Sequence, residues 1–243
     1  MYIRRKSKFV NLASFFSINA CCILFFAVVI HYFSVLNNRL FVFFCVASFL
    51  LAVVSLLFAI LTLVDLWNHG YKGGVQSLRA IIYAFIVIAP VVGCVVFYRM
   101  HPLINEVTTD LSETPKFLVG CKTLENAPEV TLSSASSSRY EANISDIVTD
   151  IKTIAKLQHL KIIKEWDDLR DNDNYYIEIQ RKSFPLGFIS VMVVRLHQES
   201  GSIFVDMRAR SCDMGSDAGI SDRFAVKFIN LLDDLVLIGN IDE

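Results

Sequence analysis

The sequence predicts a membrane-anchored α+β protein, in which three transmembrane helices precede an extracytoplasmic domain of about four antiparallel strands flanked by two helices. Two observations lead to this fold class. The chain has 243 residues and is 54% hydrophobic, which is more apolar than an ordinary water-soluble domain. Its apolar residues are concentrated in three long runs before residue 99, whereas the rest of the chain alternates between helix-like and strand-like patterns.

The membrane anchor is predicted to occupy residues 1–98. Its three apolar runs lie at about 9–36, 40–66 and 80–98, and each reaches the roughly 20 residues that a helix needs to cross a bilayer. The short connection Asn37–Arg39 suits a tight hairpin. Because the first run far exceeds the apolar stretch of about 7–15 residues in a signal peptide, we expect it to remain as an anchor. The lipid bilayer is therefore an expected partner.

Lys and Arg residues beside the runs predict the orientation of the anchor, because such residues accumulate in short cytoplasmic segments. The N-terminal tail carries four of them, and the loop before the third run carries Lys72 and Arg79. The first connection carries only Arg39. We therefore expect the N-terminus to be cytoplasmic, the helices to lie in the inner (cytoplasmic) membrane, and residues 99–243 to be extracytoplasmic, which is periplasmic in a cell with two membranes.

The charge of the chain is divided unevenly between its two parts. Residues 1–98 hold seven Lys or Arg residues and one acid, whereas residues 99–243 hold sixteen Lys or Arg residues and twenty-three acids. Nucleic-acid phosphates require a basic surface, so an acidic domain argues against a nucleic-acid partner.

The domain at 99–243 opens with a segment that contains three prolines and shows little periodicity, and we expect this segment to be an extended arm laid over the domain. A helix is predicted from Asn143 or Ser145, because Ile147, Ile151 and Ile154 share one helical face.

Four strand-like runs follow at about 160–168, 174–183, 188–196 and 202–210. The second and fourth alternate apolar and polar residues, as strands with one buried face do, and the third is apolar on both faces. A last helix is predicted from Ser216 or Asp217 to about residue 238.

Three stretches of this domain carry a family resemblance: NEVTTDLSETPKF, SFPLGFISVMVVR and VDMRARSCDMGSDAGISDRFAVKFINLL. Together they resemble the bacterial domain-of-unknown-function family catalogued as number 1499, over about residues 99–237. The resemblance implies an uncharacterised protein whose relatives often carry N-terminal membrane helices, and it implies no reaction.

Residue by residue, the resemblance covers Thr109, Asp110, Gly187, Phe188, Arg195, Val205, Asp206, Arg208, Ser211, Gly215, Ser216, Asp217 and Gly219. One departure is that relatives have two acids shortly after the Gly-Phe pair, where this chain has Ser190 and Val191. A role that required those acids would not carry over.

The strand-to-helix junction at 205–221 is the main candidate site. Strand alternation places Asp206, Arg208 and Arg210 on one face, where two arginines about 7 Å apart would hold a carboxylate or phosphate. The next helix would add backbone donors near Ser216 and Asp217. The resemblance adds Arg195 and Asp110 as ligand-binding candidates. The alternative, which we favour, is that the arginines pair with strand neighbours such as Glu178 while Ser216 or Asp217 caps the helix.

No catalytic motif joins a Ser or Cys nucleophile to a histidine base, and the cysteine spacing predicts no metal site and no cofactor. Cys121 and Cys212 lie in the domain, where an oxidising compartment would permit a disulfide, and the sequence leaves that pairing open. The sequence therefore favours a non-catalytic binding or scaffolding protein of the cell envelope, with an envelope protein as partner. The alternative is a site at 205–221 that binds a small anionic ligand or acts as an enzyme.

Overall fold

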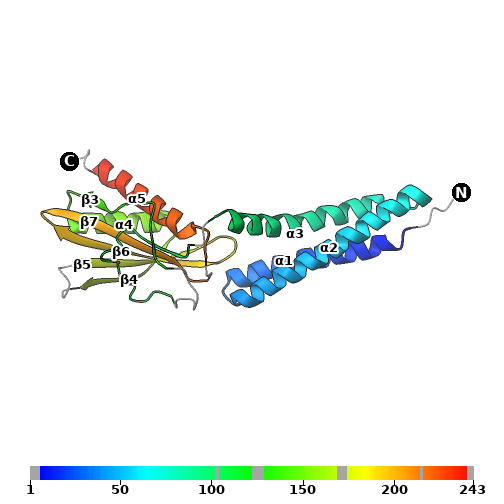
Figure 1. Ribbon diagram of the computed structural model, residues 1–243, viewed down its shortest axis with the longest axis horizontal. Helices are drawn as coiled ribbons and strands as arrows, with labels where there is room; N and C mark the ends of the chain where they lie inside the picture. Colours follow the sequence, from blue (N-terminus) through cyan, green and yellow to red (C-terminus); the bar gives the residue numbers. More distant parts are fainter. Residues whose placement is uncertain (1–5, 102–103, 122–128, 169–173, 214–215, 240–243) are drawn as a thin grey trace. The chain divides into compact units, whose positions relative to one another are not determined.

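The structure is a computed structural model that describes residues 6–101, 104–121, 129–168, 174–213 and 216–239. The chain forms two compact units (Figure 1). The first comprises Met1–Arg99 and Phe184–Gly187, and the second comprises Met100–Ser183 and Phe188–Glu243.

The first unit contains the helices α1 (Phe9–Tyr32), α2 (Asn38–His69) and α3 (Gly74–Met100). All three are long and apolar enough to cross a membrane. Large apolar side chains cover the outside of this unit, and Phe25 and Phe43 are each 63% exposed. A water-soluble bundle would bury such side chains, so the unit has the surface expected of helices that contact lipid.

Small side chains line the inside of the helical unit. They are Ala13, Ala20 and Ala27 in α1, Ser48, Ala52, Ser55 and Ala59 in α2, and Ala80 and Ala84 in α3. Small residues allow backbones to approach closely, which is how helices pack where no water drives them together. Two hydroxyls of α2 complete the contact with α1, because Ser48 donates to the carbonyl of Ala20 at 2.7 Å and Ser55 donates to that of Ala13 at 2.8 Å.

The second unit contains a mixed seven-stranded sheet, made of β1 (Glu106–Thr108), β2 (Thr131–Leu132), β3 (Ser138–Tyr140), β4 (Lys161–Asp168), β5 (Asn174–Lys182), β6 (Ile189–Glu199) and β7 (Ser202–Ser211). The strand order is β2-β1-β7-β6-β5-β4, and β3 also pairs with β7. Strands β4 to β7 form an antiparallel meander at the four runs that the sequence predicts.

The prediction of about four antiparallel strands is wrong about the number of strands and about the pairing, since β1 and β2 are parallel. The three unpredicted strands are only two or three residues long. Segments this short show no measurable alternation, so their pairing depends on the edge that β7 offers rather than on local pattern. β1 and β3 share this edge, because β1 pairs at Arg208–Arg210 and β3 pairs at Ile203–Val205.

Both helices of the second unit, α4 (Ile144–Leu157) and α5 (Ile220–Gly239), contribute to the core on one face of the sheet (Figure 1). Ile151 of α4 and Phe228 of α5 belong to one buried cluster with strand residues such as Ile177 and Met207. In the helices, the buried residues recur about every 3.6 positions and so lie on one face of the helix. In the strands, they recur every second position and so lie on one face of the sheet. These two apolar faces pack against each other.

The opposite face of the sheet is polar and yet buried. Glu178, Arg195 and Asp206 project from it and are each at most 5% exposed. Strand alternation alone would leave these side chains in water. They are buried because Thr109–Cys121, here called the arm, contacts this face through the hydrogen bonds and ion pairs that follow.

Candidate functional site

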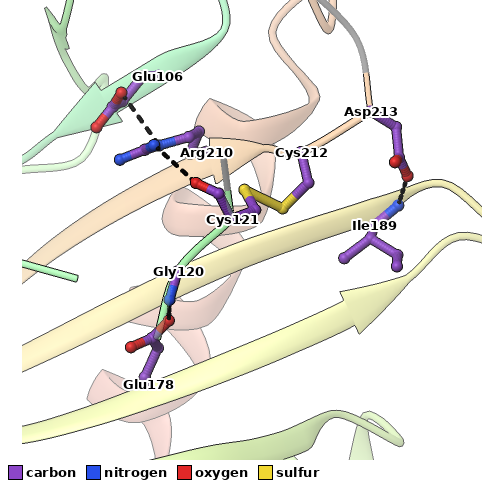
Figure 2. The surroundings of a disulfide bond; sticks show 8 residues. All are labelled: Glu106, Gly120, Cys121, Glu178, Ile189, Arg210, Cys212 and Asp213. Carbon is purple, nitrogen blue, oxygen red and sulfur yellow. Dashed lines mark hydrogen bonds and ion pairs between the residues drawn. A yellow bond between two sulfur atoms is a disulfide. The ribbon is translucent and has the colours of Figure 1, made fainter. Parts of the chain in front are cut away.

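The arm is attached to the sheet first through Glu178 of β5. The carboxylate of Glu178 accepts hydrogen bonds from the backbone amides of Leu118 and Val119 at 3.1 and 3.0 Å, and from the amide of Gly120 (Figure 2). Gly120 has a φ of +52°, a left-handed conformation that favours glycine. A fully buried carboxylate is therefore satisfied by backbone donors.

Arg208 and Arg210 of β7 bind the arm and one carboxylate of the chain itself. Both form ion pairs with Glu106 of β1, and the Arg210 Nε lies 3.2 Å from a Glu106 oxygen. Arg208 also donates to the carbonyl of Pro115 at 2.9 Å. The guanidinium carbons of the two arginines lie 5.1 and 4.7 Å from the centre of the Phe117 ring. The two arginines do converge on an anion, and that anion is Glu106.

The ion pairs of these arginines are made with Glu106, whereas Glu178, the partner suggested by the sequence, has a charge interaction with Arg210. Strand order explains the difference: β6 lies between β5 and β7, so Val193 separates Glu178 from Arg208 across the sheet. Glu106 instead sits on the neighbouring strand, directly opposite Arg210 in the β1–β7 register.

A second cluster surrounds Arg195 of β6. Its guanidinium lies 2.7 Å from Asp206, its neighbour on β7, and 3.0 Å from Asp110 of the arm. Glu113 reaches the same guanidinium at 3.4 Å. Ser137 donates a hydrogen bond to Asp206. Three of the predicted site residues, Arg195, Asp206 and Asp110, therefore meet in one buried ion-pair network.

The pKa values of this network follow from burial and pairing. Burial works to lower the pKa of Arg195, but its hydrogen bond and charge interaction with Asp206 outweigh burial and raise that pKa. Burial works to raise the pKa of Asp110, but hydrogen bonds from Ser112 and the Glu113 amide, with the charge of Arg195, lower it overall. Both groups are therefore held in their charged forms.

A disulfide closes the end of the arm. Cys121 and Cys212 are bonded, with their Cα atoms 5.5 Å apart and a sequence separation of 91 (Figure 2). Asp213, next to the bond, accepts the backbone amide of Ile189, and Arg210 donates to the carbonyl of Cys121 at 3.3 Å. The pairing that the sequence leaves open is thus formed, at the point where β7 ends.

Asp217 lies just before α5, and its side chain accepts backbone hydrogen bonds at the N-terminus of that helix. One carboxylate oxygen accepts the amide of Gly219 at 2.9 Å, and the other accepts that of Ser221 at 2.7 Å. Burial raises the pKa of Asp217, against these hydrogen bonds. The Ser216 hydroxyl accepts a weaker hydrogen bond from the amide of Ala218, at 3.4 Å. The side chains of Ser216 and Asp217 therefore accept hydrogen bonds from backbone amides at the start of α5. Gly215 lies outside the described residues.

The chemistry available at this face is limited by how its groups are paired. His197 has its Nδ1 3.3 Å from Asp206, the same carboxylate that Ser137 binds. The hydroxyl and the imidazole therefore share Asp206 as a partner, and each is engaged with this carboxylate. Among the described residues, no group of three or more His, Cys, Asp or Glu side chains is arranged to hold a metal ion.

Sequence reasoning missed Glu106, Phe117 and the role of Glu178. Glu106 and Phe117 lie in a segment without periodicity, and nothing local marks them as partners of β7. For Glu178 there was one signal: it is a carboxylate in the middle of a strand whose neighbour in the sheet is apolar on both faces. A strand that is apolar on both faces is covered on both faces of the sheet. Because β5 lies beside β6, the same cover would extend over the outer face of β5.

Fold and site together describe a protein with three long apolar helices followed by a mixed-sheet α+β domain. No family model matches the chain, and no curated protein matches it. Among solved structures the chain is similar to the crystal structure of the vertebrate conserved region (VCR) of human METTL16, with 14% identity and a TM-score of 0.31 over 39% of this chain and 76% of that chain. A similarity this weak bears on neither the fold nor the function.

Proposed function

We propose that this protein is a non-catalytic binding or scaffolding protein of the bacterial cell envelope, anchored in the cytoplasmic membrane and related to family 1499. The observation that supports this proposal is the pairing of the junction at 205–221. Arg208 and Arg210 hold Glu106, Asp206 holds Arg195, and Asp217 holds the start of α5. The charged groups that would perform chemistry there are occupied in holding the domain together.

The extracytoplasmic orientation is supported by two independent arguments. Lys72 and Arg79 lie in the connection between the second and third helices, which favours the cytoplasmic side for that connection. The Cys121–Cys212 disulfide belongs to the second unit, and disulfides persist in oxidising compartments rather than in the cytosol. Both arguments favour an extracytoplasmic location for residues 99–243.

A pair of fusions tests this orientation. Alkaline phosphatase fused after Glu243 is expected to be active, because that enzyme needs an oxidising compartment, and a green fluorescent protein at the same place is expected to be dark. Phosphatase inactivity with a bright fluorescent fusion would overturn the proposed topology. As a matched control, Lys72→Glu combined with Arg79→Glu removes the positive charges and should reduce phosphatase activity.

A second candidate function is the binding of a small anion at the junction, and one observation favours it: Arg208 and Arg210 already meet on a carboxylate. A ligand would have to displace Glu106. Glu106→Gln removes the internal competitor and is expected to create or strengthen binding of acetate or phosphate if the junction is a site. Unchanged binding in this variant would leave the structural role as the better explanation.

The non-catalytic part of the proposal has its own test. The purified full chain is expected to show no turnover across panels of ester, phosphoester and glycoside substrates. Turnover that a single change such as Asp206→Asn abolishes, with the unfolding midpoint retained, would replace the scaffolding proposal by an enzymatic one.

A further inference from the structure

A small cavity opens in the second unit, on the helix side of the sheet and away from the junction. It has a volume of about 150 Å³ and is lined by Gln158, Leu160, Arg181, Phe224, Lys227, Phe228 and Leu231. These residues come from the connection between α4 and β4, from the end of β5 and from the first three turns of α5.

The inner wall of the cavity is apolar. Phe224 and Phe228 are at least 94% buried, and Leu160 and Leu231 are partly buried against the core. A volume of about 150 Å³ has room for a group of about the size of benzene, and Gln158 and Lys227 of the lining are exposed to solvent. The cavity therefore has room for a compact group, and most of a longer chain would remain in solvent.

Two cations contribute to the lining of this apolar cavity. The Arg181 guanidinium lies over the Phe224 ring, with its carbon 5.2 Å from the ring centre. The Lys227 ammonium donates to the Gln158 side-chain oxygen at 2.8 Å. A cation stacked on a ring keeps its N–H edge available for an in-plane acceptor.

Arg181 and Lys227 differ from the cations of the domain that form ion pairs. Lys152, Arg195, Arg208 and Arg210 each form an ion pair with a carboxylate. Within the part of the chain that the structure describes, no carboxylate is ion-paired with Arg181 or Lys227. Two such cations in the lining of one cavity leave a place for an external anion.

We propose that this cavity binds a compact organic carboxylate, with its apolar body against Phe224 and Phe228 and its carboxylate between Arg181 and Lys227. The guanidinium fork matches a carboxylate, and the ammonium adds a second charge-assisted hydrogen bond. The proposal is independent of the junction at 205–221 and of membrane topology, so the failure of either leaves it standing.

The test uses the full chain in detergent and follows the ¹⁹F signal of 4-fluorobenzoate, with empty micelles as the blank. We expect saturable binding of 4-fluorobenzoate and at least about tenfold weaker binding of the neutral 4-fluorobenzamide, because the amide lacks the charge that the two cations recognise. Octanoate, whose chain exceeds the cavity, should compete poorly. Equal binding of the amide, or stronger competition by octanoate, would overturn the proposal.

Three variants locate the site. Arg181→Gln and Lys227→Gln should each weaken 4-fluorobenzoate binding by about tenfold, and Lys164→Gln, an exposed lysine outside the cavity, should leave it unchanged. Leu231→Trp keeps both charges and fills the cavity, so it should abolish binding. Urea unfolding midpoints verify that each variant folds. Wild-type affinity in folded Arg181→Gln and Leu231→Trp proteins would refute this location.

Discussion

Removal of the Cys121–Cys212 disulfide is the sharpest test of how the arm is held. The double change Cys121→Ser and Cys212→Ser opens a covalent loop whose ends are 91 residues apart in sequence. For a loop of this length, the chain-entropy relation gives a loss of about 4.6 kcal/mol in the free energy of unfolding. The hydrogen bonds of Glu178 to the arm survive in the variant. We therefore expect a domain that is folded but much less stable.

Trp166 provides the signal for this measurement. Its ring stacks on Tyr176, with ring centres 5.0 Å apart, so its fluorescence reports the packing of β4 on β5. The other tryptophan, Trp67, is 91% exposed in the first unit and is replaced by Phe in both proteins. With a urea dependence of about 2 kcal/mol per molar, the unfolding midpoint should fall by about 2 M.

The control replaces two free cysteines of the helical unit, Cys22 and Cys94, by Ser. This variant should have the wild-type midpoint. If the Cys121→Ser, Cys212→Ser protein also unfolds at the wild-type midpoint under non-reducing conditions, the disulfide does not constrain the unfolded chain and the reasoning is refuted.

Three further predictions concern buried charges, and all are measured as urea midpoints of Trp166 fluorescence. Glu178→Gln keeps the shape of the side chain but removes the charged acceptor of three amides, so it should lower the free energy of unfolding by about 2 kcal/mol. An unchanged free energy of unfolding would show that the arm does not depend on this carboxylate. Asp217→Ala removes the helix cap and should lower the free energy of unfolding by about 1 kcal/mol. Asp217→Asn still caps the helix and avoids burying a charge, so its loss should be smaller. Equal losses in the two variants would contradict the capping role. The pKa of Asp110 is lower in the folded state than in the unfolded state, so its contribution is present above the unfolded value near about 3.9 and is lost as pH falls through the folded value. The stability difference between wild type and Asp110→Asn should accordingly shrink between about pH 5 and pH 2, and a constant difference would contradict the assignment.

Much of the architecture could be predicted because it depends on local pattern. The meander from β4 to β7 and the helices α4 and α5 appear where the two-residue and 3.6-residue spacings indicate them. The three membrane-length helices follow from run length alone. The start of α3 at Gly74 rather than near residue 80 reflects its polar first turn, which hydropathy does not mark as helical.

The partners in the candidate site depended on contacts between distant segments, and these could not be predicted. Alternation correctly put Arg208 and Arg210 on one face, but the carboxylate between them comes from a three-residue strand about 100 residues earlier. Alternation puts Glu178 on the polar face of its strand, and it is buried because the arm covers that face. Pattern specifies which way a side chain points, whereas only the tertiary structure specifies what covers it.

The disulfide also determines what a protease could release from the helical unit. Cys121 lies on the chain side that leads to the helices, and Cys212 lies 91 residues further along the chain. Any single cut between these two cysteines leaves both fragments joined through the sulfur–sulfur bond. The domain would remain attached to helices α1 to α3 after such a cut, and only reduction or a cut before Cys121 would separate it from them.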